Sequence, residues 1–143
     1  MGAMSLIATA RSTPGSLRQE IVVDGRFRLF TDEPERLGGD DSAPSPHELV
    51  PAALAACVST TLLVYARTKG WELGRVDVEV VYEPKGSPRR CGIAIRIERQ
   101  LAAEQVARLE HVASTCPVRR TLEGAVEFSE QIVSGIGPGR LAA

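Results

Sequence analysis

Residues 45–70 read SPHELVPAALAACVSTTLLVYARTKG and predict one long helix near the middle of the chain. Ser45 supplies an N-cap, Pro46 suits the first helical position, and Glu48 can complete a capping box with Ser45. Glycine is common just after the last residue of a helix, so the helix is expected to run to about Thr68 and to end at Gly70.

The helix expected over residues 45–68 is interrupted early and carries no charge through most of its length. Pro51 lacks a backbone N–H, which predicts a kink or a second helix start at this position. The stretch 49–66 contains no charged residue, and its length approaches that of a membrane-spanning helix. Because a proline and the hydroxyl groups at positions 59–61 interrupt its apolar character, we interpret it as a buried core helix and expect no membrane contact.

Alternating apolar and polar residues predict strands before this helix. The runs Leu17–Val23 and Arg26–Thr31 flank Asp24-Gly25, a pattern typical of a β-hairpin. A short β-prone segment, Ser5–Ala10, precedes the hairpin. The stretch Asp32–Pro46 is rich in acidic residues, glycine and proline and is expected to be a loop.

The second half of the chain predicts further elements in the order strand, strand, helix, helix, strand. Their expected bounds are Val76–Tyr82, Cys91–Ile97, Leu101–Ala113, Cys116–Gly124 and Val126–Val133. Cys91 alternates with three isoleucines and is expected to be a structural core residue. Strands and helices that do not alternate strictly indicate an α+β fold with an antiparallel sheet.

Size and composition predict a single domain over residues 1–143. The 17 basic and 18 acidic residues give a formal charge of -1 without a basic stripe, so nucleic acid is not an expected partner. Residues 1–4 resemble a vector remnant and no signal peptide follows, so we expect a cytoplasmic protein. The glycine-rich residues 134–143 are expected to form a mobile tail.

Two of the three cysteines are candidates for chemistry. Small residues precede Cys57, which leaves two interpretations open: a packed core cysteine, or a thiol with room for a substrate beside it. Cys116 precedes Pro117 at an expected helix start, and Arg119 and Arg120 add positive charge within one turn. Both factors lower a thiol pKa, so Cys116 has the more activating local setting, although a plain cap residue beside two solvated arginines is the alternative.

The sequence predicts neither a metal site nor a bound cofactor. The two histidines, His47 and His111, lie in separate segments and show no metal-ligand spacing with the cysteines. A glycine-rich phosphate loop and the usual nucleophile motifs of hydrolases do not occur.

Three stretches together resemble the OsmC/Ohr family of thiol-dependent hydroperoxide reductases. Residues 45–57 resemble the central-helix motif of that family, and residues 116–122, CPVRRTL, resemble its second cysteine motif. Residues 32–41, DEPERLGGDD, look like the OsmC-like branch. The resemblance covers roughly residues 17–133.

The resemblance implies an α+β OsmC-like fold with a long central helix, assembled as an intertwined homodimer with two active sites at the interface. It implies reduction of organic hydroperoxides, in which Cys57 attacks the peroxide and Cys116 resolves the sulfenic acid as a disulfide. The reductant would be a dithiol, for example a lipoylated protein, and no metal or flavin would be bound.

The family also uses a glutamate and an arginine beside the attacking thiol. Glu48 stands nine positions before Cys57, whereas well-characterised Ohr members have the acidic residue ten positions before, where this chain has His47. Nine residues of ideal helix would place Glu48 opposite Cys57 and about 13.5 Å away. Glu48 therefore acts in its own subunit only if the helix breaks at Pro51. Otherwise it serves the partner subunit or is only a helix cap.

The best match to the family arginine is Arg18, in the N-terminal hairpin region. Its rivals are Arg11, Arg26 and Arg28, with Arg119 and Arg120 as local substitutes. Two other functions remain open: a redox-sensing or small-molecule-binding module without fast turnover, which the displaced acidic residue suggests, and a structural dimer with buried cysteines.

Overall fold

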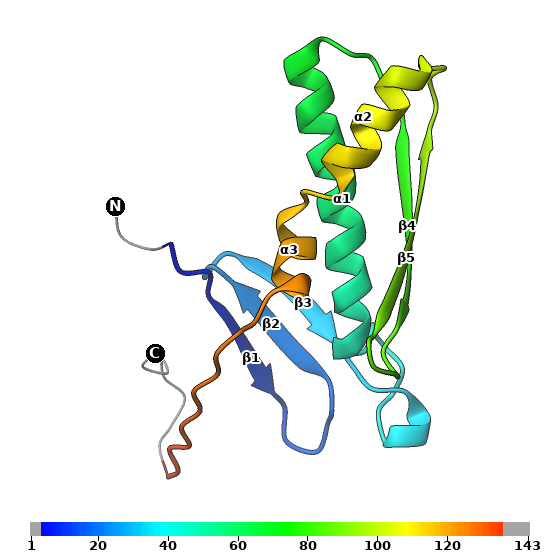
Figure 1. Ribbon diagram of the computed structural model, residues 1–143. Coiled ribbons are helices and arrows are strands. Elements are labelled where there is room, and N and C mark those ends of the chain that lie inside the picture. The colour runs from blue at the N-terminus through cyan, green and yellow to red at the C-terminus, as the bar shows by residue number, and fades with distance from the viewer. Residues whose placement is uncertain (1–3, 136–143) are drawn as a thin grey trace.

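Two antiparallel sheets and three α-helices make up the part of the chain that the structure describes, residues 4–135 of the computed structural model (Figure 1). Residues 1–3 and 136–143, most of the expected vector remnant and mobile tail, lie outside it. The strands are β1 (Ala8–Ser12), β2 (Gln19–Val23), β3 (Phe27–Thr31), β4 (Val76–Glu83) and β5 (Arg90–Ile97). The helices are α1 (Leu49–Lys69), α2 (Ala103–Ala113) and α3 (Pro117–Glu123), with short 3-10 helices η1 (Glu35–Leu37) and η2 (Pro46–Glu48). The predicted α+β class is confirmed.

The long helix begins in two steps. The 3-10 helix η2 leads directly into α1, so Pro51 lies in the first turn of α1, where its missing N–H costs no hydrogen bond. The Glu48 carboxylate accepts hydrogen bonds from the Ser45 backbone N–H at 2.8 Å and from the Ser45 hydroxyl at 3.0 Å. Gly70 ends the helix with a φ of 69°. The predicted helix end is confirmed, and a second start occurs at Leu49, two residues before the position predicted at Pro51.

The core of the domain lies along one face of α1. Its buried residues recur every four positions and are at most 2% exposed: Leu54, Val58, Leu62 and Ala66. They pack with buried side chains from the other helices and the connecting loop: Leu73, Leu109, Val112, Ala113 and Cys116. The two short helices α2 and α3 lie against α1, while the hairpin β4–β5 covers a further side of it (Figure 1).

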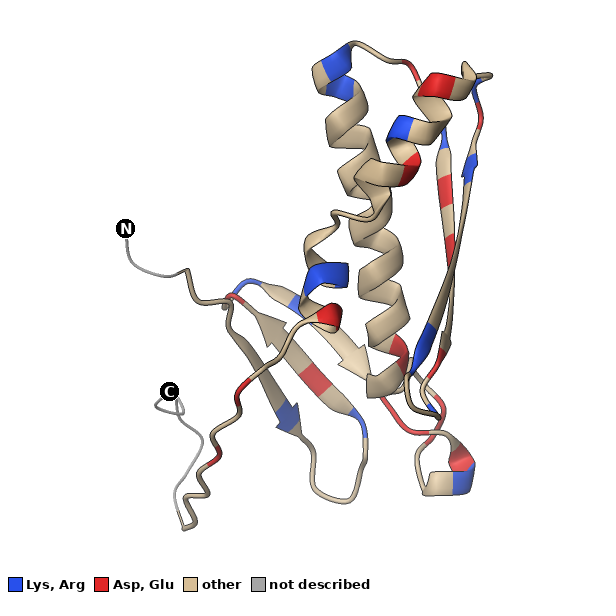
Figure 2. Cartoon of the chain, viewed as in Figure 1, with Lys and Arg blue, Asp and Glu red and all other residues tan. Residues whose placement is uncertain are grey.

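The remaining surface of α1 is uncovered. Figure 2 shows no charged residue along most of the helix, with basic residues only at its C-terminal end. By length and composition alone, Pro46–Lys69 is apolar enough to cross a membrane, and 22% of its most apolar window is buried. Leu63 and Val64 are exposed. The prediction of a buried core helix therefore holds for one face only.

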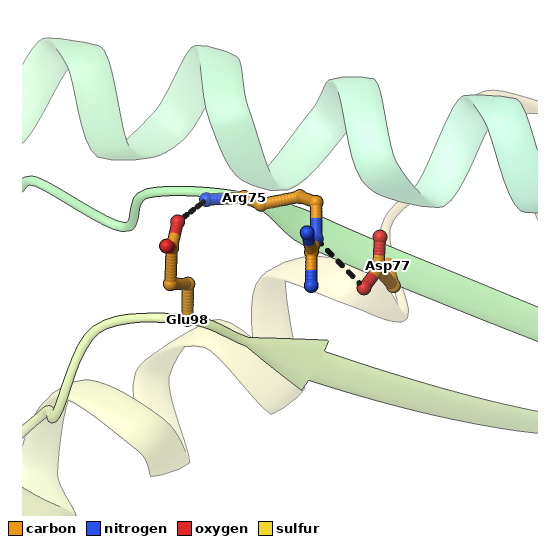
Figure 3. Close-up of polar contacts among 3 residues, drawn as sticks. All are labelled: Arg75, Asp77 and Glu98. Atoms are coloured by element: carbon orange, nitrogen blue, oxygen red, sulfur yellow. Dashed lines mark hydrogen bonds and ion pairs between the residues drawn. The ribbon is translucent and has the colours of Figure 1, made fainter.

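The hairpin β4–β5 presents alternate residues to α1. Val78 lies opposite Ile95 and Val80 opposite Ile93, and these side chains are half-buried against the core. Beyond the open end of the ladder, Glu98 accepts a hydrogen bond from the Arg75 N–H at 2.7 Å and donates its own N–H to the Arg75 carbonyl at 3.0 Å. Arg75 also contacts Asp77 at 3.1 Å (Figure 3). These contacts lie next to the last pair of the ladder, Val76 opposite Ile97.

The sheet β1–β2–β3 contributes no residue to the core cluster within residues 4–135. Its second turn contains Asp24 and Gly25 with φ values of 53° and 67°, which confirms the predicted hairpin. Its aromatic and aliphatic side chains are between 43% and 57% exposed at three positions of β3, Phe27, Leu29 and Phe30. Exposed apolar surface of this kind is typical of an interaction site.

A buried carboxylate organises the loop between β3 and η2. Asp32 is 1% exposed and accepts hydrogen bonds from the backbone N–H groups of Glu33, Asp40 and Ser42. It also accepts the Ser42 hydroxyl at 2.7 Å. The loop packs so closely that a Cβ on Gly39 would overlap the Glu33 carbonyl oxygen. The long segment predicted as a loop is therefore an ordered structure.

Two predictions for the second half of the chain are wrong. The segment Val126–Val133 forms no strand within the described residues, because it does not pair with an edge strand of either sheet. A strand requires the ladder of hydrogen bonds that such pairing provides. Cys91 is exposed instead of being a core residue. It faces a cavity of about 930 Å³, shared with Tyr82 and Arg119, and so lacks the packing against α1 that its neighbours have.

Candidate active site

The thiols of Cys57 and Cys116 lie close enough for each to shift the pKa of the other, and Cys57 packs against the core cluster that contains Cys116. Cys57 projects from the third turn of α1 and is half-buried. Cys116 is the N-cap of α3 and is fully buried, with 0% of its surface exposed. The packing of α3 against α1 thus joins two cysteines that are far apart in the sequence. Neither cysteine is an isolated core residue, because each thiol has the other as a polar partner.

Hydrogen bonds make Cys57 the more acidic thiol of the pair. Burial is the largest single influence and raises the pKa of Cys57. The Cys116 thiol, the Val118 backbone N–H and the Thr61 hydroxyl donate hydrogen bonds to the Cys57 sulfur, and together they outweigh burial. The pKa of Cys57 is therefore lowered, which favours the nucleophilic thiolate.

Cys116 shows the opposite behaviour. Burial raises the pKa of Cys116, and its hydrogen bond to Cys57 and the negative charge of the Cys57 thiolate raise it further. The backbone N–H groups of Arg119 and Val118 only partly offset these effects. The sequence-based expectation that Cys116 has the more activating setting is wrong. The Arg119 guanidinium binds Glu123 at 2.7 Å instead of the thiol, and Arg120 is exposed.

Cys57 opens into a cavity of about 870 Å³ between α1 and α2. Its wall is mainly apolar or hydroxyl-bearing and includes Ala56, Thr60, Val64, Val112 and Pro117. Two basic side chains, Arg108 and His111, also line the cavity. The space suits an organic molecule with an apolar body that presents a reactive group to the thiol.

Glu48 does not line the Cys57 cavity. Its carboxylate is exposed and capped by Ser45, and these hydrogen bonds lower the pKa of Glu48. It borders a separate cavity of about 550 Å³, together with Ser42 and Ala52. Within one chain, Glu48 is therefore a helix cap at some distance from Cys57.

Arg18 lies next to the Glu48 cavity and likewise does not line that of Cys57. Its guanidinium donates a hydrogen bond to the Ser42 hydroxyl at 2.6 Å and stacks over the Phe30 ring at 4.5 Å. Ser42 in turn donates its hydroxyl to Asp32 and lines the cavity that Glu48 borders.

The other candidate arginines of the hairpin region also lie outside the Cys57 cavity. Arg26 pairs with Asp24 at 3.0 Å, and Arg28 pairs with Glu20 at 3.1 Å. Arg11 lies opposite Glu20 on the edge strand β1. Among the described residues, no cluster of three or more His, Cys, Asp or Glu side chains could hold a metal ion.

Thr61, Tyr65 and Arg108 line the Cys57 cavity but were not singled out from the sequence. Thr61 stands four positions after Cys57 on a helix, a spacing that places both side chains on one face. The sequence therefore contained a signal for Thr61. Arg108 comes from α2, and only the packing of two helices brings it to the site.

Comparison with known proteins relates the whole fold to one family. The OsmC-like protein family model matches residues 39–131. A crystal structure from Psychrobacter arcticus, provisionally named an osmotic stress induced and detoxification response protein, is 26% identical with a TM-score of 0.70. That alignment covers 85% of this chain and 90% of that one.

Two organic hydroperoxide resistance proteins are also similar in structure. The OsmC protein of Legionella pneumophila is 25% identical with a TM-score of 0.60, covering 87% of this chain and 93% of that one. OhrB of Bacillus subtilis is 20% identical with a TM-score of 0.57, covering 85% and 92%. No curated protein matches the chain. Since the family model spans well over half of the sequence, and the fold agrees with it, the chain belongs to the OsmC-like protein family.

Proposed function

We propose that this protein is a cysteine-based peroxidase that reduces organic hydroperoxides. The observation that carries the proposal is the contact between Cys57 and Cys116, with a lowered pKa on the first thiol and a raised pKa on the second. A peroxidatic thiol must be a nucleophilic thiolate, while a resolving thiol can stay protonated until it is needed. The Legionella pneumophila relative is named an organic hydroperoxide resistance protein, which supports the same substrate class.

The reaction follows from these two thiols. The Cys57 thiolate attacks a peroxide oxygen, the O–O bond breaks, and the departing alkoxide takes up a proton to leave as an alcohol. Cys57 is thereby oxidised to a sulfenic acid. The Cys116 sulfur then displaces the hydroxyl group, which leaves as water with the Cys116 proton, and a disulfide forms. A dithiol reductant, such as a lipoylated protein, returns both cysteines to thiols and becomes a cyclic disulfide.

The homodimer is part of this proposal. Arg18 and Glu48 gather at one cavity away from the Cys57 of their own chain. We therefore assign them to the Cys57 site of the partner subunit, where a guanidinium and a carboxylate would orient the peroxide and the thiolate. The exposed apolar surfaces of β3 and α1 support such an assembly.

Single cysteine variants test the chemistry. Wild-type protein, with dihydrolipoamide as the dithiol, is expected to consume tert-butyl hydroperoxide over many turnovers. Cys57→Ser should abolish consumption, and Cys116→Ser should slow turnover, because the Cys57 sulfenic acid must then react with the dithiol directly instead of condensing with Cys116. Cys91→Ser is the matched control, since this thiol lines a different cavity, and it should retain wild-type activity. Unchanged turnover in Cys57→Ser would refute the assigned role.

Mixed dimers test the assignment of Arg18 to the partner's site. Arg18→Ala and Cys57→Ser homodimers should each be weakly active or inactive. If the two variants are mixed and allowed to exchange subunits, a dimer containing one of each regains one complete site, provided that Arg18 acts across the interface. No recovery after demonstrated subunit exchange would show that Arg18 acts within its own chain, or not at all.

A redox-sensing or small-molecule-binding module is the alternative function. The observation in its favour is that no carboxylate lines the Cys57 cavity within the described chain. Mass spectrometry at short times after one equivalent of peroxide separates the two functions. A Cys57–Cys116 disulfide that forms within seconds supports the peroxidase, whereas a slow or absent disulfide supports the module.

A further inference from the structure

Arg108 is a fixed cation at the cavity into which Cys57 opens. Its Nε donates a hydrogen bond to the Tyr65 hydroxyl at 2.8 Å, and its guanidinium carbon lies 5.5 Å from the centre of the Tyr65 ring. Both residues line the Cys57 cavity. The aromatic ring and hydroxyl of Tyr65 thus restrict the position of a long side chain that is otherwise exposed.

The charge of Arg108 is not neutralised within residues 4–135. None of the ion pairs formed by described residues includes it, and no acidic side chain lines the cavity. Its bond to Tyr65 uses only Nε, so the two terminal amino groups remain available to a ligand. His111, one helical turn further along α2, adds a second polar group to the same wall.

The remaining cavity wall is chemically different. Ala56, Val64, Val112 and Pro117 offer an apolar surface between the thiol and the solvent. A cavity of about 870 Å³ has room for a ligand of drug-like size. The Cys57 cavity is therefore suited to a ligand with an apolar body and one anionic group.

We propose that Arg108 is a specificity-determining residue that binds the carboxylate of the substrate, so that the enzyme selects amphipathic hydroperoxides carrying a carboxylate over neutral ones. This inference rests on the proposed peroxidase function. The guanidinium holds the carboxylate through its terminal amino groups. The apolar body lies along α1, and the peroxide group reaches Cys57. The residue takes no part in the bond changes at sulfur.

The test compares two substrates that differ only in charge: linoleic acid hydroperoxide and its methyl ester, both below the concentration at which micelles form. Wild-type protein should show a higher kcat/KM for the acid. Arg108→Gln should lower the acid-to-ester ratio about two- to fivefold, the range expected of a partly exposed ion pair, with little change for the ester. Tyr65→Phe should give a smaller loss, because Arg108 then lacks its hydrogen-bond partner.

Arg96→Gln on β5 is the matched control, because it removes the same charge from an exposed position outside the cavity. If Arg96→Gln lowers the ratio as much as Arg108→Gln, the effect is one of net charge and the proposal is wrong. An unchanged ratio in Arg108→Gln also overturns it. Added salt should reduce the wild-type preference, since the ion pair is partly exposed.

Binding without turnover separates this inference from the peroxidase function. In a Cys57→Ser background, laurate should bind several times more tightly than dodecanol, and Arg108→Gln should remove the difference. If wild-type protein reduces no hydroperoxide but this difference is found, the peroxidase function fails while the carboxylate site stands. If laurate and dodecanol bind equally well, the carboxylate site is refuted whatever the peroxidase assay shows.

Discussion

The lowered pKa of Cys57 arises from hydrogen-bond donors, without a contribution from the charge of an arginine. The three donors to its sulfur come from α1, from α3 and from the residue that caps α3. A buried thiolate is unfavourable unless such donors replace the lost water. The site therefore depends on how α3 packs against α1, and each donor can be removed separately.

Replacing Thr61 by Val should raise the pKa of Cys57, because the thiolate loses a hydroxyl donor while the side chain keeps its shape. Since the thiolate is the reacting form, alkylation by iodoacetamide at neutral pH should slow severalfold. The pH at which the rate reaches its plateau should move upward. Thr60→Val is the matched control, as it lines the same cavity without contacting the sulfur. Equal pH profiles for the two variants would contradict the role of Thr61.

The sequence identified both cysteines but not the direction of their pKa shifts. The motif around Cys116 suggested activation by Arg119, yet Arg119 binds Glu123 four positions later. That i, i+4 pairing was present in the sequence and competes with the thiol for the guanidinium. The acidity of Cys57 depends on Cys116 and Val118, which are distant in the chain, so local patterns did not contain it.

At the level of elements, the loop between β3 and η2 depends on Asp32. Its hydrogen bond with the Ser42 hydroxyl is the main cause of the lowered pKa of Asp32, and backbone donors add to it in spite of burial. A carboxyl whose folded pKa is depressed stabilises the protein above its unfolded pKa. This stabilisation is lost as the pH falls through the folded value.

Asp32→Asn should therefore lower the Tm at neutral pH, because an amide cannot accept all four hydrogen bonds. The difference in Tm between variant and wild type should shrink below about pH 3.8, the ordinary pKa of the group. Thermal unfolding followed by circular dichroism from pH 7 to pH 2.5 measures this. Asp41→Asn, an exposed position in the same loop, is the control and should leave the Tm nearly unchanged. A Tm deficit that is constant with pH would show that the charge of Asp32 is unimportant.

Alanine substitutions of two apolar residues in α2 should differ in their effect on stability. Leu109 is 3% exposed and belongs to the core, so Leu109→Ala should cost about 2–5 kcal/mol. Val106 is 43% exposed, so Val106→Ala should lower the free energy of unfolding by less than about 1 kcal/mol. Urea unfolding with an unchanged m-value tests both variants. Similar losses of stability in the two variants would contradict the burial of Leu109 and the exposure of Val106.

Periodicity was sufficient for the helices and for the hairpin β4–β5, because their partners are close in sequence. It failed for Val126–Val133, where alternation predicted a strand but no sheet edge accepts it within residues 4–135. An alternating sequence predicts that one face of a strand is apolar. It does not predict which neighbouring strand will supply the hydrogen bonds, and that strand can belong to another chain.

At the scale of the whole molecule, apolar surface is exposed in three separate places. These are the sheet β1–β3, the outer face of α1, and the segment after α3, where Phe128 is 81% exposed and Ile132 is 96% exposed. A formal charge of -1 gives little repulsion between copies. A homodimer that buries these surfaces would also place Arg18 and Glu48 beside a foreign Cys57. The proposed assembly would therefore account both for the exposed surfaces and for the position of Arg18 and Glu48 outside the Cys57 cavity of their own chain.

Ile132→Asp should weaken this dimer if the segment after α3 packs on the partner subunit, because a charge would be buried in the interface. Ser129→Asp is the matched control: it adds the same charge within the same exposed segment, at a position that has no apolar side chain. Sedimentation velocity over a range of protein concentrations should give a dimer for wild type and Ser129→Asp, and a shift toward monomer for Ile132→Asp. Because the site is proposed to need both subunits, peroxide turnover should fall together with the dimer fraction. A monomeric wild-type protein with full activity would refute both the assembly and the assignment of Arg18 to the partner's site.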